Sequence, residues 1–412
     1  MIPELRKKFN SEFTQEKYEL FLNDLNTSLK YPMDFRVSET PLFLSNELKK
    51  KLLYACDELC KQVTTPDFKM KMKDAVPSHL NIPDETDHPE FFVFDFAVCS
   101  SRHPNGGGMT DRNKSTDEFY PKLIELQGFP TLYGYQYFFE QILKKHFNIP
   151  KNFTQYFNNV SADEYVKMLK DVIVADADPE NVILLEIEPE KQKTRVDFAV
   201  TEKLLGIKEI CISDLIKRGR NLYYKMNLPT GQAGGKEIPI ERIYNRVIFD
   251  ELSRTKVKFN FDIREEINVK WIPHPNWFYK MSKYSLPILK GEFVPKCFYL
   301  RDLTSYPTDL KNYVLKPLFS FAGLGVKVDV TKQMLDEIKD PKNYILQEKV
   351  EYAPLIETPD EKAKVEIRMM YIWKDEPLLV NNLVRESKGK MMGVDFNKNK
   401  TWVGGSTALH KT

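Results

Sequence analysis

The stretch YVLKPLFSFAGLGVKVDV, from Tyr313 to Val330, decides the fold expected of this chain. Apolar and β-branched residues surround Lys316, which is typical of a strand, and Gly323 and Gly325 follow in a short loop. Glycine lets backbone N–H groups approach phosphate oxygens, and a fixed lysine supplies the compensating charge. The pattern predicts a strand, a phosphate-binding glycine loop and a second strand. A plain hairpin with a glycine turn is the alternative.

Length and composition indicate a globular protein of two or three packed units, because the chain has 412 residues. Lys plus Arg number 61 and Asp plus Glu number 59, so the net charge of +2 predicts neither nucleic acid nor a membrane as partner. We find no secretory signal and no window near the roughly 20 apolar residues of a spanning helix. The five cysteines form no C-x-x-C pair, so we expect reduced thiols in the cytoplasm.

The first 275 residues change character along their length. Residues 1–75 show helical spacing, in which Cys56 and Cys60 are either core thiols, the favoured interpretation, or a metal pair. FFVFDFAV (91–98) and FYPKLIEL (119–126) indicate two antiparallel strands joined by a long loop with three glycines. Helical patterns follow at 131–147 and 161–171. From 172 onward strands alternate with helices, one of them closed by Gly206, which predicts a small parallel α/β unit.

The last third reads as a helix and then mostly strands. We expect a helix over Trp277–Leu289, a short helix at MLDEIKD (334–340) and a strand at YILQEKV (344–350). The final strands are predicted at VEIRMMYIW (365–373), EPLLVNNLVRES (376–387) and KGKMMGVDF (388–396).

Several polar residues in these strands suggest chemistry. Arg368, on the same strand face as Glu366, and Arg385 suit a transferring phosphoryl group, although a surface ion pair is the alternative. Asp95 and Glu125 lie in apolar runs of adjoining strands, where a carboxylate needs a cation or hydrogen bonds, unless both face solvent.

These pieces, in this order, resemble the ATP-grasp family. The nucleotide-binding half of that family matches LKP…AGLGV, then ILQEKV, then EIRMMYIWKDEPLLVNNLVRES. The metal-binding hairpin of the family resembles FDF at 94–96 and PKLIELQG at 121–128, which precede the nucleotide half instead of following it. The chain is therefore similar to circularly permuted members such as the glutathionylspermidine synthetase group. QKT-x-x-DF (192–198) and YNRVIFDEL (244–252) resemble the α/β domain of that group.

The resemblance implies an α+β fold: a circularly permuted ATP-grasp core, a small parallel α/β domain and a helical N-terminal segment. The implied divisions are a helical segment (1–90), the metal-ligand hairpin with helices (91–165), the α/β domain (166–275) and the nucleotide-binding region (276–412). The closing Gly404-Gly405-Ser406-Thr407 resembles a glycine-bearing segment near the acyl phosphate, or is a disordered tail.

The resemblance also assigns candidate residues. The ATP-binding set is Lys283 (or Lys280), Lys316, Ser320, Gly323, Gly325, Gln347, Glu348, Val350 and Glu351. The Mg²⁺ set is Asp95, Glu125 and Gln127, the catalytic arginines are Arg368 and Arg385, and Arg246 is the candidate for holding a substrate carboxylate. One departure is that the family's E-x-N reads E-L-Q, which puts a longer side chain at Gln127.

The implied function is an ATP- and Mg²⁺-dependent carboxylate–amine or carboxylate–thiol ligase that acts through an acyl phosphate. Its substrates are expected to be small: an amino acid, a peptide or a polyamine-like molecule. Two alternatives stay open. One is a non-catalytic nucleotide-binding protein, which the glutamine at position 127 favours, and the other is a kinase-like phosphotransferase on the same fold.

Overall fold

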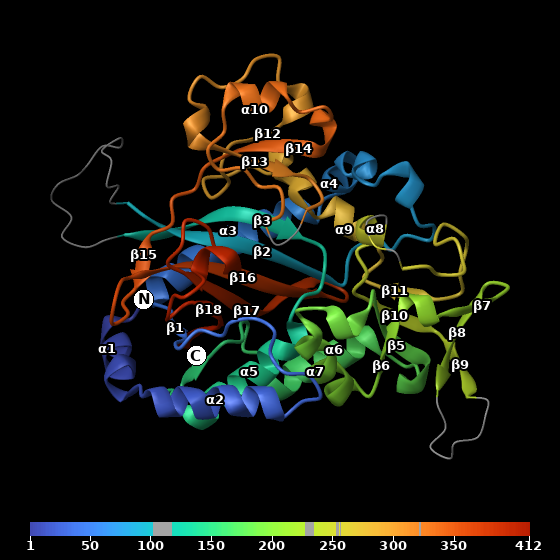
Figure 1. Cartoon of the computed structure of the whole chain (residues 1–412), viewed down its shortest axis with the longest axis horizontal. Helices are drawn as coiled ribbons and strands as arrows, with labels where there is room; N and C mark the ends of the chain where they lie inside the picture. The colour runs from blue at the N-terminus through green and yellow to red at the C-terminus, as the bar shows by residue number, and fades with distance from the viewer. Residues whose placement is uncertain (102–117, 227–234, 253–254, 256, 321–322) are drawn as a thin grey trace.

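The computed structural model describes residues 1–101, 118–226, 235–252, 255, 257–320 and 323–412, and these form a mixed α+β structure with several sheets (Figure 1). The predicted loop glycines at 106–108 lie outside the described residues. In the described residues, no helix is long and apolar enough to cross a membrane.

A six-stranded sheet forms the centre of the molecule. Its strand order is β18-β17-β16-β2-β3, and β15 pairs with β16. The strands are β2 (Phe91–Ser100), β3 (Phe119–Gln127), β15 (Pro354–Ile356), β16 (Ala363–Trp373), β17 (Pro377–Ser387) and β18 (Gly404–Ser406). The two predicted strands around Asp95 and Glu125 do pair antiparallel, and β16 pairs antiparallel with β2. This register is what brings the C-terminal arginine strands beside the N-terminal carboxylates.

Burial on both faces explains why β2 is almost wholly apolar. Phe92, Phe94 and Phe96 point into one core cluster, whereas Phe91 and Val93 belong to a cluster on the other face. Alternate side chains of a strand point to opposite faces, so a strand covered on both sides reads as a continuous apolar run. Asp95 is the one charged residue of this strand, so its buried carboxylate needs hydrogen-bond or ion-pair partners.

A small lobe carries the stretch that begins at Tyr313. It holds a three-stranded antiparallel sheet of order β12-β14-β13 and the short helix α10 (Lys332–Asp336), above the central sheet in Figure 1. The strands are β12 (Cys297–Tyr299), β13 (Tyr313–Pro317) and β14 (Tyr344–Glu348). The prediction of a second strand after the glycine loop is wrong. Only a single bridge forms there, between Leu315 and Lys327.

The predicted parallel α/β unit is present. Its sheet has the order β11-β10-β5-β6, every pair is parallel, and α7 is capped by Gly206, whose φ of +76° favours glycine. Its elements are α6 (Ala162–Ile173), β5 (Val182–Glu186), α7 (Arg195–Leu205), β6 (Lys208–Cys211), β10 (Arg242–Asn245), α8 (Phe249–Leu252) and β11 (Lys270–Ile272). A three-stranded antiparallel sheet extends from it, built of β7 (Ile216–Arg218), β8 (Asn221–Met226) and β9 (Lys236–Ile240).

The N-terminal residues are mostly helical, as predicted, but they also join the C-terminal end of the chain. Strand β1 pairs in parallel with β19, which in turn pairs with β4. The elements are α1 (Pro3–Glu12), α2 (Gln15–Thr27), β1 (Leu42–Phe43), α3 (Asn46–Val63), α4 (Pro66–Lys71), α5 (Tyr133–His146), β4 (Phe153–Thr154) and β19 (Ala408–Lys411). The closing glycines lie in β18, so the segment is ordered in the sheet and is not a disordered tail.

Two predicted elements of the last third need correction. The helix expected over 277–289 is two short pieces, α9 (Asn276–Lys280) and a 3₁₀ segment η6 (Lys283–Ile288). Ser282 starts the second piece by accepting a hydrogen bond from the Tyr284 N–H, and Pro287 cannot donate one. The predicted strand KGKMMGVDF is wrong, because the Asn397 side chain accepts from the Lys388 and Gly389 N–H groups and turns the chain.

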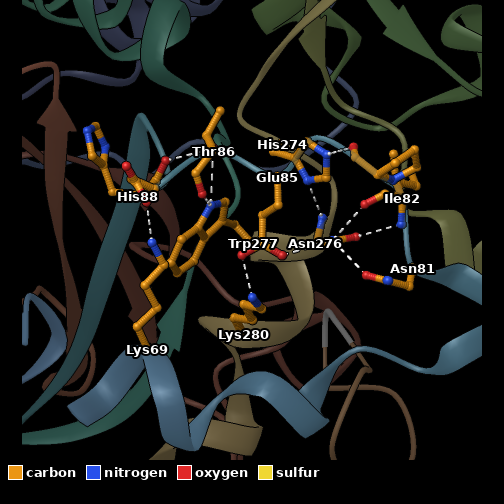
Figure 2. A network of polar contacts seen from close by, with 12 residues as sticks. Lys69, Asn81, Ile82, Glu85, Thr86, His88, His274, Asn276, Trp277 and Lys280 are labelled. Atoms are coloured by element: carbon orange, nitrogen blue, oxygen red, sulfur yellow. Dashed lines mark hydrogen bonds and ion pairs between the residues drawn. The ribbon is translucent and has the colours of Figure 1, made fainter. Parts of the chain in front are cut away.

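A buried polar network fixes α9 against the segment that leads into β2 (Figure 2). The Asn276 amide donates to Asn81 Oδ1, the Ile82 carbonyl and Glu85, at 2.9 to 3.0 Å, and accepts from the Ile82 N–H. Lys280 forms an ion pair with Glu85. Since Asn276 is 1 % exposed, these bonds satisfy groups that burial would otherwise penalise. The network anchors the chain directly before Lys283.

Candidate functional site

The predicted phosphate lysine and the predicted metal hairpin meet in space. Lys316 lies on β13 of the small lobe and is 8 % exposed. Its Nζ donates to the Ile124 carbonyl of β3 at 3.2 Å, across 192 positions of sequence. Burial lowers the pKa of Lys316, although the nearby Glu125 carboxylate opposes the shift. This contact joins the glycine-loop lobe to the strand that carries Glu125.

Lys283 makes a second connection between the same two parts. It is 6 % exposed, so it is not a surface lysine, and its Nζ lies 2.6 Å from Glu125 Oε1. It also donates to the Ser320 carbonyl in the glycine loop. Lys280, the alternative to Lys283, instead forms its ion pair with Glu85.

Glu125 is held ionised by these lysines. Burial alone raises its pKa, but Lys283, Lys316 and a hydrogen bond from Gln127 outweigh burial and lower the pKa to about 2. A carboxylate with so low a pKa is fully charged at neutral pH. It is therefore available as an anionic ligand or as the counter-ion of two buried ammonium groups.

Asp95 is engaged by both predicted catalytic arginines. Arg368 donates to the two oxygens of Asp95 from Nε and Nη2, each at 2.7 Å, which is the bidentate geometry of a strong ion pair. Arg385 Nη2 lies 2.8 Å from Asp95 Oδ2. Asp95 is 1 % exposed, so this pairing resolves the cost of a carboxylate in an apolar strand.

The polar network continues on either side of the two arginines. Arg368 Nη2 donates to Gln127 Oε1 at 3.2 Å. Arg385 Nη2 is 3.1 Å from Glu366 Oε1, and the Tyr352 hydroxyl donates to Glu366 Oε2 at 2.6 Å. Burial raises the pKa of Glu366, although the Arg385 guanidinium opposes the shift.

The charges of this network leave an excess of cations. The acidic members are Asp95, Glu125 and Glu366, and the basic members are Lys283, Lys316, Arg368 and Arg385. Four basic groups against three acidic groups give one unmatched positive charge in a poorly solvated place. Such a place favours an anion with several oxygen acceptors, and phosphate is of that kind.

A cavity of about 800 Å³ opens beside this network. Among the predicted site residues, it is lined by Glu125, Gln127, Arg246, Lys283, Ser320, Gly323, Arg368 and Arg385. Gly404 and Gly405 of β18 line it as well. At Gly404, φ is +126° and an added Cβ would lie 2.4 Å from the Arg36 carbonyl oxygen, so only glycine fits this wall.

Three residues of the predicted ATP-binding set line a second, larger cavity of about 1470 Å³. Glu348, Val350 and Glu351 face it, together with Lys122 of β3. Lys316 contacts Ile124, which lies between Lys122 on this cavity and Glu125 on the smaller one. Lys316 itself lines neither cavity.

Gln347 and Gly325 border neither cavity, yet each has a distinct local feature. Gln347 is 1 % exposed and its Nε2 is buried without a hydrogen-bond partner in the described residues. Its Cα pairs with Val314 of β13, two residues from Lys316, so Gln347 and Lys316 share one face of the small sheet. Gly325 has a φ of +76°, and an added Cβ would lie 2.8 Å from Pro317, so this turn requires glycine.

The Mg²⁺ set fits a hard cation in part. Glu125 and Gln127 line the cavity and offer carboxylate and amide oxygens, and Mg²⁺ usually needs only one or two carboxylates beside substrate phosphates. Asp95 has both oxygens bound by guanidinium groups in this arrangement. In the part of the chain that the structure describes, no three His, Cys, Asp or Glu side chains gather as a metal-binding group.

Arg246, the candidate for holding a substrate carboxylate, is already paired. It is 3 % exposed, its Nη1 lies 3.3 Å from Asp197 Oδ2, and it donates to the Pro130 carbonyl. Asp197 also accepts from the Leu132 and Tyr135 N–H groups. Arg246 therefore joins β10 to α7 and to the chain before α5, with its Nε left without a partner in the described residues.

Sequence reasoning missed Glu186 as a site residue. It is the last residue of β5, 6 % exposed, and it lines the same cavity as Glu125 and Arg385. The one signal in the sequence is a carboxylate that ends the apolar run VILLE, where a buried charge needs an explanation.

Comparison of the sequence with protein-family models and with curated proteins finds no match. The fold and the site therefore have to support a function on their own geometry.

Proposed function

We propose that this protein is an ATP-dependent ligase of the circularly permuted ATP-grasp type, which joins a carboxylate to an amine or thiol. The observation that carries the proposal is the double contact between the glycine-loop lobe and β3. Lys316 reaches the Ile124 carbonyl, and Lys283 links Ser320 to Glu125. Residues that the resemblance assigns to the phosphates and to the metal are thus neighbours, although they lie far apart in the sequence.

The arrangement suggests how ATP would lie. The adenosine end would occupy the larger cavity beside Glu348, Val350 and Glu351, and the phosphates would pass Lys316 toward the smaller one. Lys283, Ser320 and Gly323 would then meet the terminal phosphates at the smaller cavity. The unmatched positive charge of the network supports this placement.

The proposed chemistry has two steps. A substrate carboxylate oxygen attacks the γ-phosphorus of ATP, which forms an acyl phosphate and releases ADP. The amine or thiol then attacks the acyl carbon, the new C–N or C–S bond forms, and inorganic phosphate leaves while the nucleophile loses its proton to solvent. Catalysis of this kind is chiefly positioning and charge stabilisation.

In this proposal each part of the network has one task. Arg368 and Arg385 stabilise the phosphoryl group in transfer and the acyl phosphate, and Asp95 orients both guanidinium groups. Glu125 and Gln127 would hold Mg²⁺, which supplies charge neutralisation to the phosphates when bound. Lys283 then exchanges its contact with Glu125 for one with phosphate oxygens.

The test is ADP release with ATP, Mg²⁺ and pooled amino acids, small peptides and polyamines. We expect release by the wild type, loss of at least about 100-fold for Lys316→Ala, and no change for Lys332→Ala, an exposed lysine on α10. Release that is unchanged by Lys316→Ala would refute the assignment. Calorimetry with ATP and a non-hydrolysable analogue then separates loss of binding from loss of turnover.

The second candidate is a nucleotide-binding protein without turnover. The contact of Gln127 Oε1 with Arg368 favours it, because this oxygen is directed at a guanidinium group and not at a free metal position. ATP binding that Lys316→Ala abolishes, with no product from any acceptor, would select this candidate over the ligase.

A further inference from the structure

The smaller cavity reaches the parallel α/β sheet at a distinctive point. The chain runs from β5 to β6 on one side and then returns to β10 on the other side of β5, so the strand order reverses between β5 and β10. In open parallel sheets, ligands bind in the crevice outside the carboxyl ends of the strands at such a reversal. Glu186 ends β5 and Arg246 follows β10, and both line the cavity.

The side chains of Arg246 and Glu186 differ in how many hydrogen-bond and ion-pair partners they have. Arg246 has Asp197 and the Pro130 carbonyl as partners. Glu186 accepts one hydrogen bond, from the Ile187 N–H to Oε1 at 2.8 Å. Glu186 is only 6 % exposed. Even so, among the described residues no Lys, Arg or His forms an ion pair with it.

The surroundings of Glu186 disfavour its charge when the cavity holds no ligand. Burial raises the pKa of Glu186 to about 8; the Arg246 guanidinium lowers it in part, and Glu251 adds to the rise. Glu251 lines the same cavity. Two of the lysines at the cavity wall, Lys191 and Lys400, have acidic partners of their own, Glu188 and Glu361.

We propose that Glu186 binds the ammonium group of a cationic amine substrate at the β5–β10 reversal. A buried carboxylate without a counter-ion is complementary to a cation that brings its own hydrogen-bond donors. This inference specifies that the acceptor substrate of the proposed ligase is an amine. It rests on the proposed function only for the statement that the bound amine is the acceptor.

The experiment measures amine binding without ATP or Mg²⁺, so that it does not depend on ligation. Calorimetry compares 1,5-diaminopentane with 1,5-pentanediol, a neutral probe of similar shape, on the wild type, Glu186→Gln and Glu190→Gln. Glu190 is an exposed residue four positions along the same segment and is the matched control.

We expect the wild type to bind the diamine and not the diol. Loss of one charge-assisted contact should weaken diamine binding about tenfold or more in Glu186→Gln and leave Glu190→Gln unchanged. Equal diamine affinity of Glu186→Gln and the wild type would overturn the inference, and so would a wild type that does not prefer the diamine. Glutamine mimics the protonated acid in shape, so thermal melting should show Glu186→Gln folded.

The outcomes separate this inference from the proposed function. Diamine binding that depends on Glu186, in a protein that releases no ADP with any acceptor, would support the amine site and refute the ligase. ADP release that depends on Lys316, with equal diamine affinity in wild type and Glu186→Gln, would refute the amine site alone.

Discussion

Replacing Glu125 by Gln should destabilise the folded protein in a manner that depends on pH. The folded-state pKa of Glu125 is lowered from 4.5 to about 2, chiefly by Lys283 acting against burial. A carboxylate with a lowered pKa contributes stability above its unfolded pKa, and this stability is lost as the pH falls through the folded value. The relevant window is therefore about pH 4.5 down to 2.

The magnitude follows from the two pKa values. At about 1.4 kcal/mol for each pKa unit, the difference corresponds to roughly 3 kcal/mol at pH 7. The side chain of Glu125 is 19 % exposed and the side chain of Lys283 is 7 % exposed, so solvent screens this pair less than a surface ion pair. At pH 3 the same relation leaves roughly 1 kcal/mol.

The assay is urea unfolding of the wild type and Glu125→Gln at pH 7 and pH 3, without nucleotide. The control is Glu118→Gln, which removes a 44 % exposed partner of Lys51 and should cost under about 1 kcal/mol at either pH. Equal stability of the wild type and Glu125→Gln at pH 7 would refute the reasoning. A stability gap that is as large at pH 3 as at pH 7 would refute it too.

Three further predictions concern other buried groups. Asp95→Asn should lower the free energy of unfolding by roughly 3 to 5 kcal/mol in chemical denaturation, because Arg368 and Arg385 lose their shared counter-ion; a loss below 1 kcal/mol, on the order of a surface pair, would contradict this. Glu186→Gln should be more stable than the wild type at pH 8, since the unfolded chain releases its proton near 4.5 and the folded chain only near 8, so wild-type stability falls between these values. The melting curves of the wild type and Glu186→Gln should coincide at pH 4 and separate at pH 8. A Glu186→Gln variant that is less stable than the wild type at pH 8 would contradict this prediction. Burial raises the pKa of Cys60 to about 12, so a thiol reagent should label Cys60 slowly in the folded protein and fully in denaturant, as mass mapping of this residue can check; fast labelling in the folded state would be inconsistent with it.

The local sequence predicted those elements in which the spacing of apolar residues matches the spacing of buried residues. β2 is an apolar run rich in aromatic and β-branched residues, and α7 ends where Gly206 allows a left-handed turn. Local sequence failed where a side chain competes with the strand ladder. Asn397 accepts from two backbone N–H groups of the run 388–396, and no periodicity records that interaction.

The candidate site was predictable only as separate parts. Lysine in a strand, a glycine loop and carboxylates in apolar runs each have a local pattern, and each also has a structural alternative. The structure places Lys283 and Glu125 in contact, and it pairs Asp95 with Arg368. It also pairs Arg246 with Asp197, which the sequence alone did not indicate.

The sequence by itself therefore determined those elements that depend on neighbours a few residues away, and the kinds of side chain they carry. Only the tertiary structure decided which charges meet. Arg368 and Asp95 are 273 positions apart and meet through the register of β16 with β2. Glu186 gains its meaning in the same manner, since its burial, its missing counter-ion and its place at the β5–β10 reversal depend on strands and helices from several parts of the chain.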